Sequence, residues 1–406
     1  MICIDTLHVG LNRFLLLVVG LWPYQQSKFV RFQVTLFFGI LASFILFQFA
    51  AFLTLKCTPD LLVNVLSSAL FHTMFAIKYI SFSINTKIVK YLLEQLQHMH
   101  NELTDKNEIN IIEKYGNYAK SYTIAFLLLV VTMVLSLTLY LFWPHIFNIL
   151  FFTNETRSRL SLPYMTEYFV DQEKYLYLIL FHANAAFAIG AVAMLATGTM
   201  LVFYQQHACG MFRIARRITY SYRIERAMTF RTLQKNSLEN ENLVYKGLIC
   251  AVDMHRRAMK LVSIQQFSNL TVSRFKVMFS LLIIVGVISA SLNFFRIFQV
   301  ISFGYNAMEL SLPVMILIIQ LVYMMITNYL AQEIMDHNND IYVTVYKVQW
   351  YMASLQTQKL ILFLLQRSTK AFTMNIAGLF VGSLEGAATL LSTALSYFTV
   401  LHSAQH

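Results

Sequence analysis

The chain alternates long apolar runs with polar segments, and seven of the runs are long enough to cross a membrane as helices. A bilayer core about 30 Å thick is spanned by about 20 apolar helical residues. The pattern therefore predicts an all-α integral membrane protein in which residues 1–406 form a single membrane domain with seven transmembrane helices. The predicted transmembrane segments are residues 32–55, 61–83, 121–150, 175–204, 277–295, 311–332 and 372–402.

Two of these segments begin with sequences typical of helix starts. Thr58 precedes Pro59 at the second segment, and Ser311 precedes Leu312 and Pro313 at the sixth. A hydroxyl can accept a hydrogen bond from a free amide of the first turn, and proline lacks a donor that the first turn does not need. Both positions are therefore expected to mark the outer ends of their helices.

The composition agrees with a chain that lies mostly in lipid. Hydrophobic residues make up 57% of it and charged residues 13%, and the mean hydropathy is +0.57. A typical soluble domain has about 25% charged residues, so this chain cannot cover an ordinary water-exposed surface. The four cysteines are dispersed and contain no CxxC pair, which does not match a disulfide framework.

The distribution of basic residues predicts the orientation. Residues 1–31, 84–120, 205–276 and 333–370 lie on one side and together hold 25 Lys and Arg, whereas the segments on the other side hold 4. Basic residues favour the cytoplasm, so the N-terminus is expected inside and the C-terminus outside. Residues 1–31 are then a cytoplasmic lead-in that lies in the membrane interface, and residues 205–276 are a cytoplasmic loop with helix extensions.

This orientation is opposite to that of a G-protein-coupled receptor, which has an extracellular N-terminus. The net charge of +11 lies mainly beside the apolar segments, where anionic lipid headgroups account for it without a nucleic-acid partner. The tripeptide Asn154-Glu155-Thr156 falls on the predicted outside, which makes Asn154 a candidate glycosylation site. Asn269 begins a second such tripeptide on the predicted inside, where it is expected to stay unmodified.

Motifs of enzymes and cofactor sites are missing from the sequence. It contains no GxGxxG, GxxxxGK, HExxH or GxSxG. His98 and His100 are two residues apart and would point to different sides of a helix, which makes them a poor pair of metal ligands. We therefore expect no catalytic residues, no metal and no cofactor.

The outer halves of the second, third, fourth and sixth segments combine aromatic side chains with a few polar groups. Such a cleft suits a small lipophilic or volatile ligand. Ordinary packing, an aromatic belt at the membrane surface and interhelical hydrogen bonds from His72 and His182 remain alternatives. The candidate ligand-binding residues are Phe71, His72, Phe75, Ser136, Leu139, Tyr140, Trp143, Phe181, Asn184, Phe187, Met315 and Tyr323.

The last segment carries a polar stripe along one helix face. Small hydroxylated residues recur there at helical spacing, interrupted by Val400. The stripe is typical of close helix packing through small residues or of the wall of a water-filled conduit that narrows at the valine, and the pattern does not separate the two. A carboxylate within a membrane segment often marks function. The candidate pore residues are Glu385, Thr393, Ser396, Val400 and Ser403.

The C-terminal part of the chain contains several distinctive short motifs. They are Gly378 to Phe380, Ser383 to Glu385 and Ser396 to Leu401, together with Tyr346 and Trp350 and with Gln366 to Lys370 before the last segment. In these motifs the chain resembles the insect odorant receptors. Chain length, the number of segments and the lead-in from Asn12-Arg13 to Trp22-Pro23 are similar over the whole chain, although the motifs are specific only in about the last 70 residues.

The resemblance implies a ligand-gated, non-selective cation channel that assembles as a heterotetramer with a shared odorant co-receptor subunit. It implies that small volatile ligands bind in the membrane-embedded cleft, and that the last helix, residues 372–402, lines a pore with Val400 at a hydrophobic gate. Residues 333–370 would contain a cytoplasmic anchor helix, from about Ile341 to Gln366, that contacts neighbouring subunits. Its expected contact residues are Tyr346, Trp350, Leu355 and Leu362.

Departures from the family pattern favour an odour-tuning subunit over the co-receptor. Ser403 stands where the co-receptor has glutamine, and the loop of residues 205–276 is too short for the cytoplasmic insertion of the co-receptor. Ala387 stands where the family commonly has phenylalanine after the glutamate, which changes the packing expected beside Glu385. By resemblance the protein is expected in the plasma membrane of olfactory neuron dendrites. A gustatory-type receptor channel and, less so, a G-protein-coupled receptor are the alternatives; a transporter would need helix interruptions that the sequence lacks.

Overall fold

The computed structural model describes most of the chain, and its described part is helical. The candidate residues Asn154 and Trp350, and the side chain of Trp143, lie outside the described residues. The described residues are 9–25, 27–56, 58–103, 105–151, 164–172, 174–233, 266–303, 307–347, 355, 358, 359, 362, 365, 366, 375–376 and 380–405.

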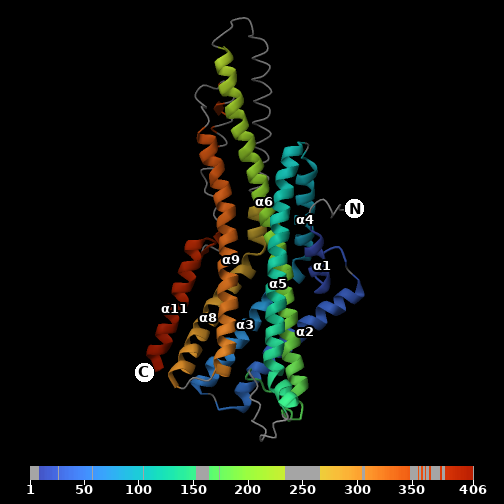
Figure 1. The fold of residues 1–406 in the computed structure, drawn as a ribbon, viewed down its shortest axis with the longest axis vertical. Coiled ribbons are helices and arrows are strands. Elements are labelled where there is room, and N and C mark those ends of the chain that lie inside the picture. The colour runs from blue at the N-terminus through green and yellow to red at the C-terminus, as the bar shows by residue number, and fades with distance from the viewer. Residues whose placement is uncertain are drawn as a thin grey trace.

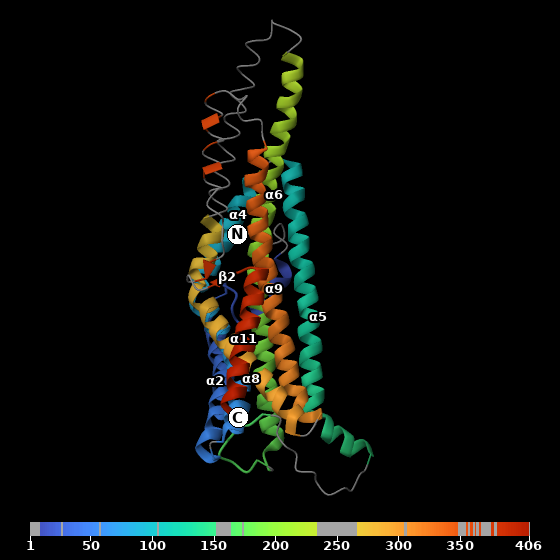
Figure 2. The ribbon, with the colours of Figure 1, turned by 90° about the vertical axis from the view of Figure 1, so that its left-hand side faces the viewer.

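Long helices run roughly along one axis and make an elongated bundle, with the short helix α1 on its flank (Figures 1 and 2). Two short antiparallel strands of two residues each precede the last helix. The elements are α1 (Gly10–Val18), α2 (Lys28–Thr54), α3 (Pro59–Ile84), α4 (Thr86–Asn101), α5 (Lys106–Phe151), α6 (Leu176–Leu233), α8 (Lys276–Phe303), α9 (Ala307–Tyr346), β1 (Asn375–Ile376), β2 (Phe380–Val381) and α11 (Leu384–Gln405).

Seven of these helices are long and apolar enough to cross a membrane, which confirms the predicted number. They are α2, α3, α5, α6, α8, α9 and α11. The helix α6 lies centrally, because it packs against α1, α2, α3, α5 and α9. Its polar side chains Thr197, Thr199 and Gln206 are accordingly buried. The main hydrophobic core therefore forms around α6 and α3.

The helix α3 begins where the sequence predicts. Thr58 has an extended backbone, and its Oγ1 accepts a hydrogen bond from the Leu61 amide at 3.2 Å. Pro59 follows as the first helical residue, where its missing N–H has no partner to lose. The hydroxyl-proline start is therefore confirmed.

The prediction for the start of α9 was wrong. The described helix already includes Ala307, and Pro313 lies inside it. Pro313 therefore removes one helical hydrogen bond, the one that its amide would have donated to the Glu309 carbonyl. The helix continues because the loss of a single bond is offset by burial of Leu312 and Ile316, which pack in the main core.

The N-terminal lead-in folds onto the bundle. Leu15 and Leu16 of α1 are buried in the main core, and α1 packs against α6 and α5. Gly20 ends this helix with φ +72°, a conformation that side chains disfavour. The Tyr79 hydroxyl of α3 then donates a hydrogen bond to the Val19 carbonyl at 2.9 Å. The lead-in is therefore fixed by contacts with the bundle.

The last helix is shorter than predicted, since it begins at Leu384 rather than at Phe372. Before it, β1 and β2 pair antiparallel. The Ser383 Oγ accepts a hydrogen bond from the Gly386 amide at 2.9 Å and so caps the new helix. Glu385 therefore lies in the first turn, where a carboxylate is favoured by the helix dipole, and not in mid-span.

Candidate functional site

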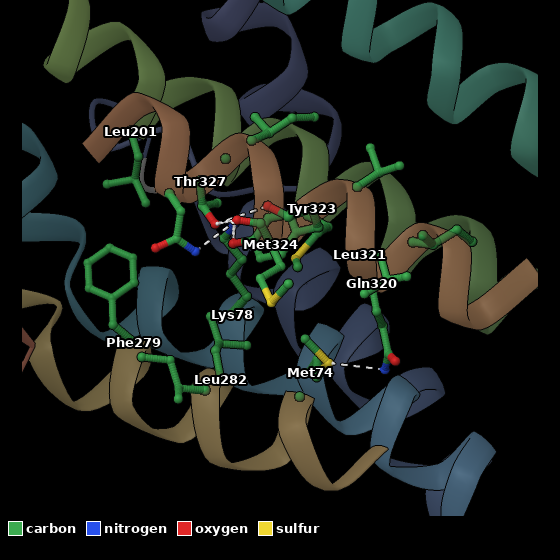
Figure 3. Close-up of a pocket in the computed structure, with 18 of the residues that line it drawn as sticks. Met74, Lys78, Leu201, Phe279, Leu282, Gln320, Leu321, Tyr323, Met324 and Thr327 are labelled. Carbon is green, nitrogen blue, oxygen red and sulfur yellow. Dashed lines mark hydrogen bonds between the residues drawn. The ribbon is translucent and has the colours of Figure 1, made fainter. Parts of the chain in front are cut away.

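A cavity of about 280 Å³ lies within the helix bundle. Residues from α3, α5, α6, α8, α9 and α11 line it, so nearly every transmembrane helix contributes to its wall. Most of the lining is aliphatic, aromatic or methionine side chains. Figure 3 shows the part of the wall where α3 and α8 face α9. The last helix contributes Leu390, Leu391 and Ala394, so the cavity touches the helix that carries the polar stripe.

Lys78 of α3 brings a charge into this apolar wall. Its side chain is buried, and its Nζ donates a hydrogen bond to the Tyr323 hydroxyl of α9 at 2.8 Å. The two side chains point toward one another in Figure 3. No Asp or Glu occurs among the described residues that line the cavity. Lys78 therefore has a neutral partner where a buried cation would ordinarily have an anion.

Gln320 is another polar group of the wall. Its Nε2 donates to the Ser289 hydroxyl of α8 at 2.8 Å and lies 3.8 Å from the Met74 sulfur. Its Oε1 is buried and has no hydrogen-bond partner among the described residues. A carbonyl oxygen in that state can accept a hydrogen bond from a ligand hydroxyl or amine.

Glycines make room for these side chains. A Cβ at Gly190 of α6 would lie 2.2 Å from the Phe75 ring, so α3 and α6 pack there without space for a methyl group. A Cβ at Gly198 would lie 3.3 Å from the Lys78 Nζ. Gly198 therefore leaves room for the buried Lys78 ammonium group against α6, and Gly190 sets the distance between α3 and α6.

The structure brings Phe75, Phe187 and Tyr323 to the cavity wall. Phe71 and His72 instead lie in an aromatic cluster nearer the start of α3, where the His72 ring is 4.8 Å from Phe44 and 5.6 Å from Tyr164. His72 Nδ1 is 2.8 Å from the Ser68 carbonyl of its own helix. Burial raises the pKa of the Tyr164 hydroxyl, which keeps it a neutral phenol. Phe71 and His72 are therefore not part of the cavity wall.

The other candidates lie outside the cavity wall. Leu139 and Phe181 are exposed on the outer surface of the bundle, at 56% and 67%. Asn184 accepts a hydrogen bond from the Thr138 hydroxyl of α5 at 3.0 Å. The remaining described candidates are Ser136, which is exposed, and Tyr140 and Met315, which pack against the main core.

On α11, the predicted pore stripe faces away from the rest of the chain. Ala387 and Ala394 are the buried residues of α11, which packs mainly against α8 and α9 among the described elements. Ser396 and Ser403 are exposed, and Val400 is 62% exposed. The hydroxyls of Thr393, Ser396 and Ser403 donate to carbonyls of their own helix, at 2.8 to 3.2 Å. These three hydroxyls therefore make no hydrogen bonds to the other helices that the structure describes.

The family model for the 7tm odorant receptors matches residues 58–395, which include the cavity and most of the last helix. The chain belongs to the odorant receptor family. It is thus a multi-pass membrane receptor and not an enzyme. No curated protein matches it.

The receptor's fold is also that of two solved structures. The olfactory receptor OR5 of Machilis hrabei in complex with eugenol is similar with a TM-score of 0.74 at 14% identity, over 98% of this chain and 97% of that one. A second structure of the same olfactory receptor is similar with a TM-score of 0.69 at 14% identity, over 97% of each chain. At such identity the likeness concerns the fold, which confirms the seven-helix architecture.

The receptor's candidate anchor residues are exposed where the structure describes them. Tyr346, at the end of α9, is 62% exposed, and Leu355 and Leu362 are 68% and 66% exposed. Large apolar side chains in this state are typical of surfaces that contact another protein.

Several residues of the receptor's cavity are not among the predicted ligand-binding residues, since the cavity lies deeper in the bundle than the predicted cleft. On α3 it reaches Lys78, on α5 it is lined by residues 126–133, and on α9 it continues to Ala331. Each shift runs toward the helix ends predicted to face the cytoplasm. Lys78 could have been found from the sequence, because a charge within a membrane segment is costly and marks a candidate site. The packing that leaves the cavity open has no comparable sequence signal.

Proposed function

We propose that this odorant receptor is an odour-tuning subunit of a ligand-gated, non-selective cation channel. It assembles as a heterotetramer with a co-receptor subunit in the plasma membrane, with its N-terminus in the cytoplasm and its C-terminus outside. The observation that carries the proposal is the position of α11, which has the cavity on one face and an exposed polar stripe on the other.

The shared wall supplies a route from ligand to pore. A ligand in the cavity would contact Leu391 and Ala394, and the stripe residues Thr393 and Ser396 lie within one helical turn of these positions. A rigid helix transmits displacement along its length, so a ligand that fits better with α11 displaced favours the displaced state. The resulting movement would widen the path that the stripe borders.

The exposed stripe supports the conduit interpretation over close packing within the chain. Small residues bring helices together where they are buried, and on α11 the buried small residues are Ala387 and Ala394. The hydroxylated face stays exposed and is free to border water or the same helix of a neighbouring subunit. Val400 is the apolar position in it, and a ring of such residues can exclude water until it widens.

The anchor surface of Tyr346, Leu355 and Leu362 supports an assembly. Exposed aromatic and leucine side chains at the cytoplasmic end would have a lower free energy in contact with equivalent surfaces of other subunits than in water. We place the subunit contacts there, around the central axis on which the α11 helices converge.

Recording from cells that express the receptor with a co-receptor tests the proposal. A panel of volatile ligands should evoke cation current, and Val400→Ser, which hydrates the proposed gate, should raise the current without ligand. Val131→Ser is the matched control, since Val131 is 44% exposed on α5, away from the stripe. Equal resting currents for the wild type and both variants would remove Val400 from the gate.

A further inference from the structure

Lys78 distinguishes this cavity from a purely apolar one. Of the described residues that line the cavity, Lys78 alone carries a charge. It is 1% exposed and lies within a transmembrane helix, where an uncompensated charge is expensive. Its hydrogen-bond partner Tyr323 is neutral, so the charge is solvated by one phenol and not balanced. An anion that enters such a site balances the charge of Lys78 and so stabilises the site.

The geometry leaves donors free for that anion. An ammonium group has three N–H donors, and one of them is used by the Tyr323 hydroxyl. The Tyr323 hydroxyl accepts that bond and keeps its own proton for donation. Gly198 leaves α6 without a side chain beside the ammonium group, because any larger residue would place a Cβ 3.3 Å from Nζ. Lys78 and Tyr323 together can therefore hold both oxygens of a carboxylate.

The rest of the wall fits an alkyl chain. Met74, Phe279 and Leu282 lie around Lys78 in Figure 3, and methionine side chains adapt to chains of varied shape. The cavity volume of about 280 Å³ lies just below the usual range for ligand pockets, about 300–1,000 Å³. It suits a short acid better than a long-chain fatty acid from the membrane.

We propose that the cavity selects small carboxylic acids, with Lys78 and Tyr323 binding the ionised head and the apolar wall binding the tail. This inference rests on the proposed function, since it names the ligand class of the same cavity. Neutral alcohols and esters of equal chain length would bind more weakly, because they leave the ammonium group unbalanced.

The test uses the full-length receptor in lipid nanodiscs and measures binding without any channel activity. Hexanoic acid, 1-hexanol, methyl hexanoate and oleic acid are compared by the ligand-induced rise in melting temperature. The variants are Lys78→Met, which keeps the length of the side chain without its charge, and Lys78→Arg, which keeps the charge. Lys120→Met is the control for loss of an exposed lysine on α5.

We expect hexanoic acid to bind the wild type most tightly. Lys78→Met should weaken that binding about tenfold or more, the loss expected when a charge-assisted hydrogen bond is removed. The same substitution should change the affinity for 1-hexanol by no more than about twofold, because the cavity wall remains apolar. Lys78→Arg should retain acid binding, and Lys120→Met should behave as the wild type. A folded Lys78→Met receptor is expected, since removing an unbalanced buried charge does not destabilise the bundle.

The inference is overturned if Lys78→Met and the wild type bind hexanoic acid equally, or if 1-hexanol binds the wild type as tightly as the acid. Tighter binding of oleic acid than of hexanoic acid would assign the site to a membrane fatty acid and overturn its assignment to a small ligand. Acid binding that depends on Lys78 in a receptor that passes no current would sustain the ligand class and refute the channel. Current evoked by neutral ligands in a receptor that does not bind the acid would sustain the channel and refute the ligand class.

Discussion

The helices α6 and α11 are both long enough to cross the membrane, yet they use their side chains differently. In the most apolar stretch of α6, 72% of the residues are buried inside the chain, whereas the corresponding share for α11 is 17%. Polar residues of α6 such as Thr197 and Thr199 bond to their own helix and face other helices. Polar residues of α11 bond in the same way but face outward. The apolar stretch of α6 thus packs mostly within one chain, while α11 has a face left for water or a neighbouring subunit.

The largest expected effect concerns the packing of α6. Gly190→Ala should destabilise the receptor by about 3 kcal/mol, the upper end for overpacking, because the added methyl group would lie 2.2 Å from the Phe75 ring. Gly39→Ala on α2 is the control, since nothing lies within 4 Å of its added Cβ. Thermal unfolding in nanodiscs measures both.

Equal melting temperatures for the two alanine variants would show that α3 and α6 are not in the close contact described. A selective loss for Gly190→Ala would support it and would also predict weaker ligand binding, because Phe75 lines the cavity.

Opposite faces of α11 should respond differently to the same added bulk. Ala394 is 2% exposed and packs with Ala290 of α8 and Leu317 of α9, so Ala394→Leu should cost about 2 kcal/mol. Ser396, two residues along, is exposed, and Ser396→Leu should leave stability within about 0.5 kcal/mol. The melting temperature and the ligand-evoked current of each variant make the comparison.

A conduit along the stripe predicts that Ser396→Leu reduces current while the receptor remains stable. If Ser396→Leu instead unfolds the receptor, that face is packed in the assembly, and the stripe serves helix contact.

The sequence predicted the membrane-spanning helices because apolar run length is a local property. Capping at Thr58 is local too, and that start was correct. The start of α11 depended on β2 folding back onto its first turn, where Gly386 has room for no Cβ because the Val381 carbonyl would lie 2.3 Å away. The cavity depends on how Phe75, Gly190 and Lys78 from different helices fit together, and helical spacing cannot show such contacts. Helical spacing placed the candidate aromatic residues on the correct helices, but several of them about one or two turns away from the cavity, toward the predicted extracellular ends.

The smallest expected effect tests the start of α11. The Ser383 Oγ accepts a hydrogen bond from the Gly386 amide at 2.9 Å. The Ser383 amide donates a hydrogen bond to Asn328 Oδ1 of α9 at 3.2 Å. Ser383→Ala removes the cap and keeps the backbone bond to α9, so it should cost about 1 kcal/mol of helix stability. Because Asn328 and Leu391 both line the cavity, the same change should shift the half-maximal ligand concentration about fivefold. Ser392→Ala, an exposed change in mid-helix, should shift neither the melting temperature nor that concentration. A Ser383→Ala receptor with unchanged melting temperature and ligand response would mean that α11 does not depend on this cap for its place beside the cavity.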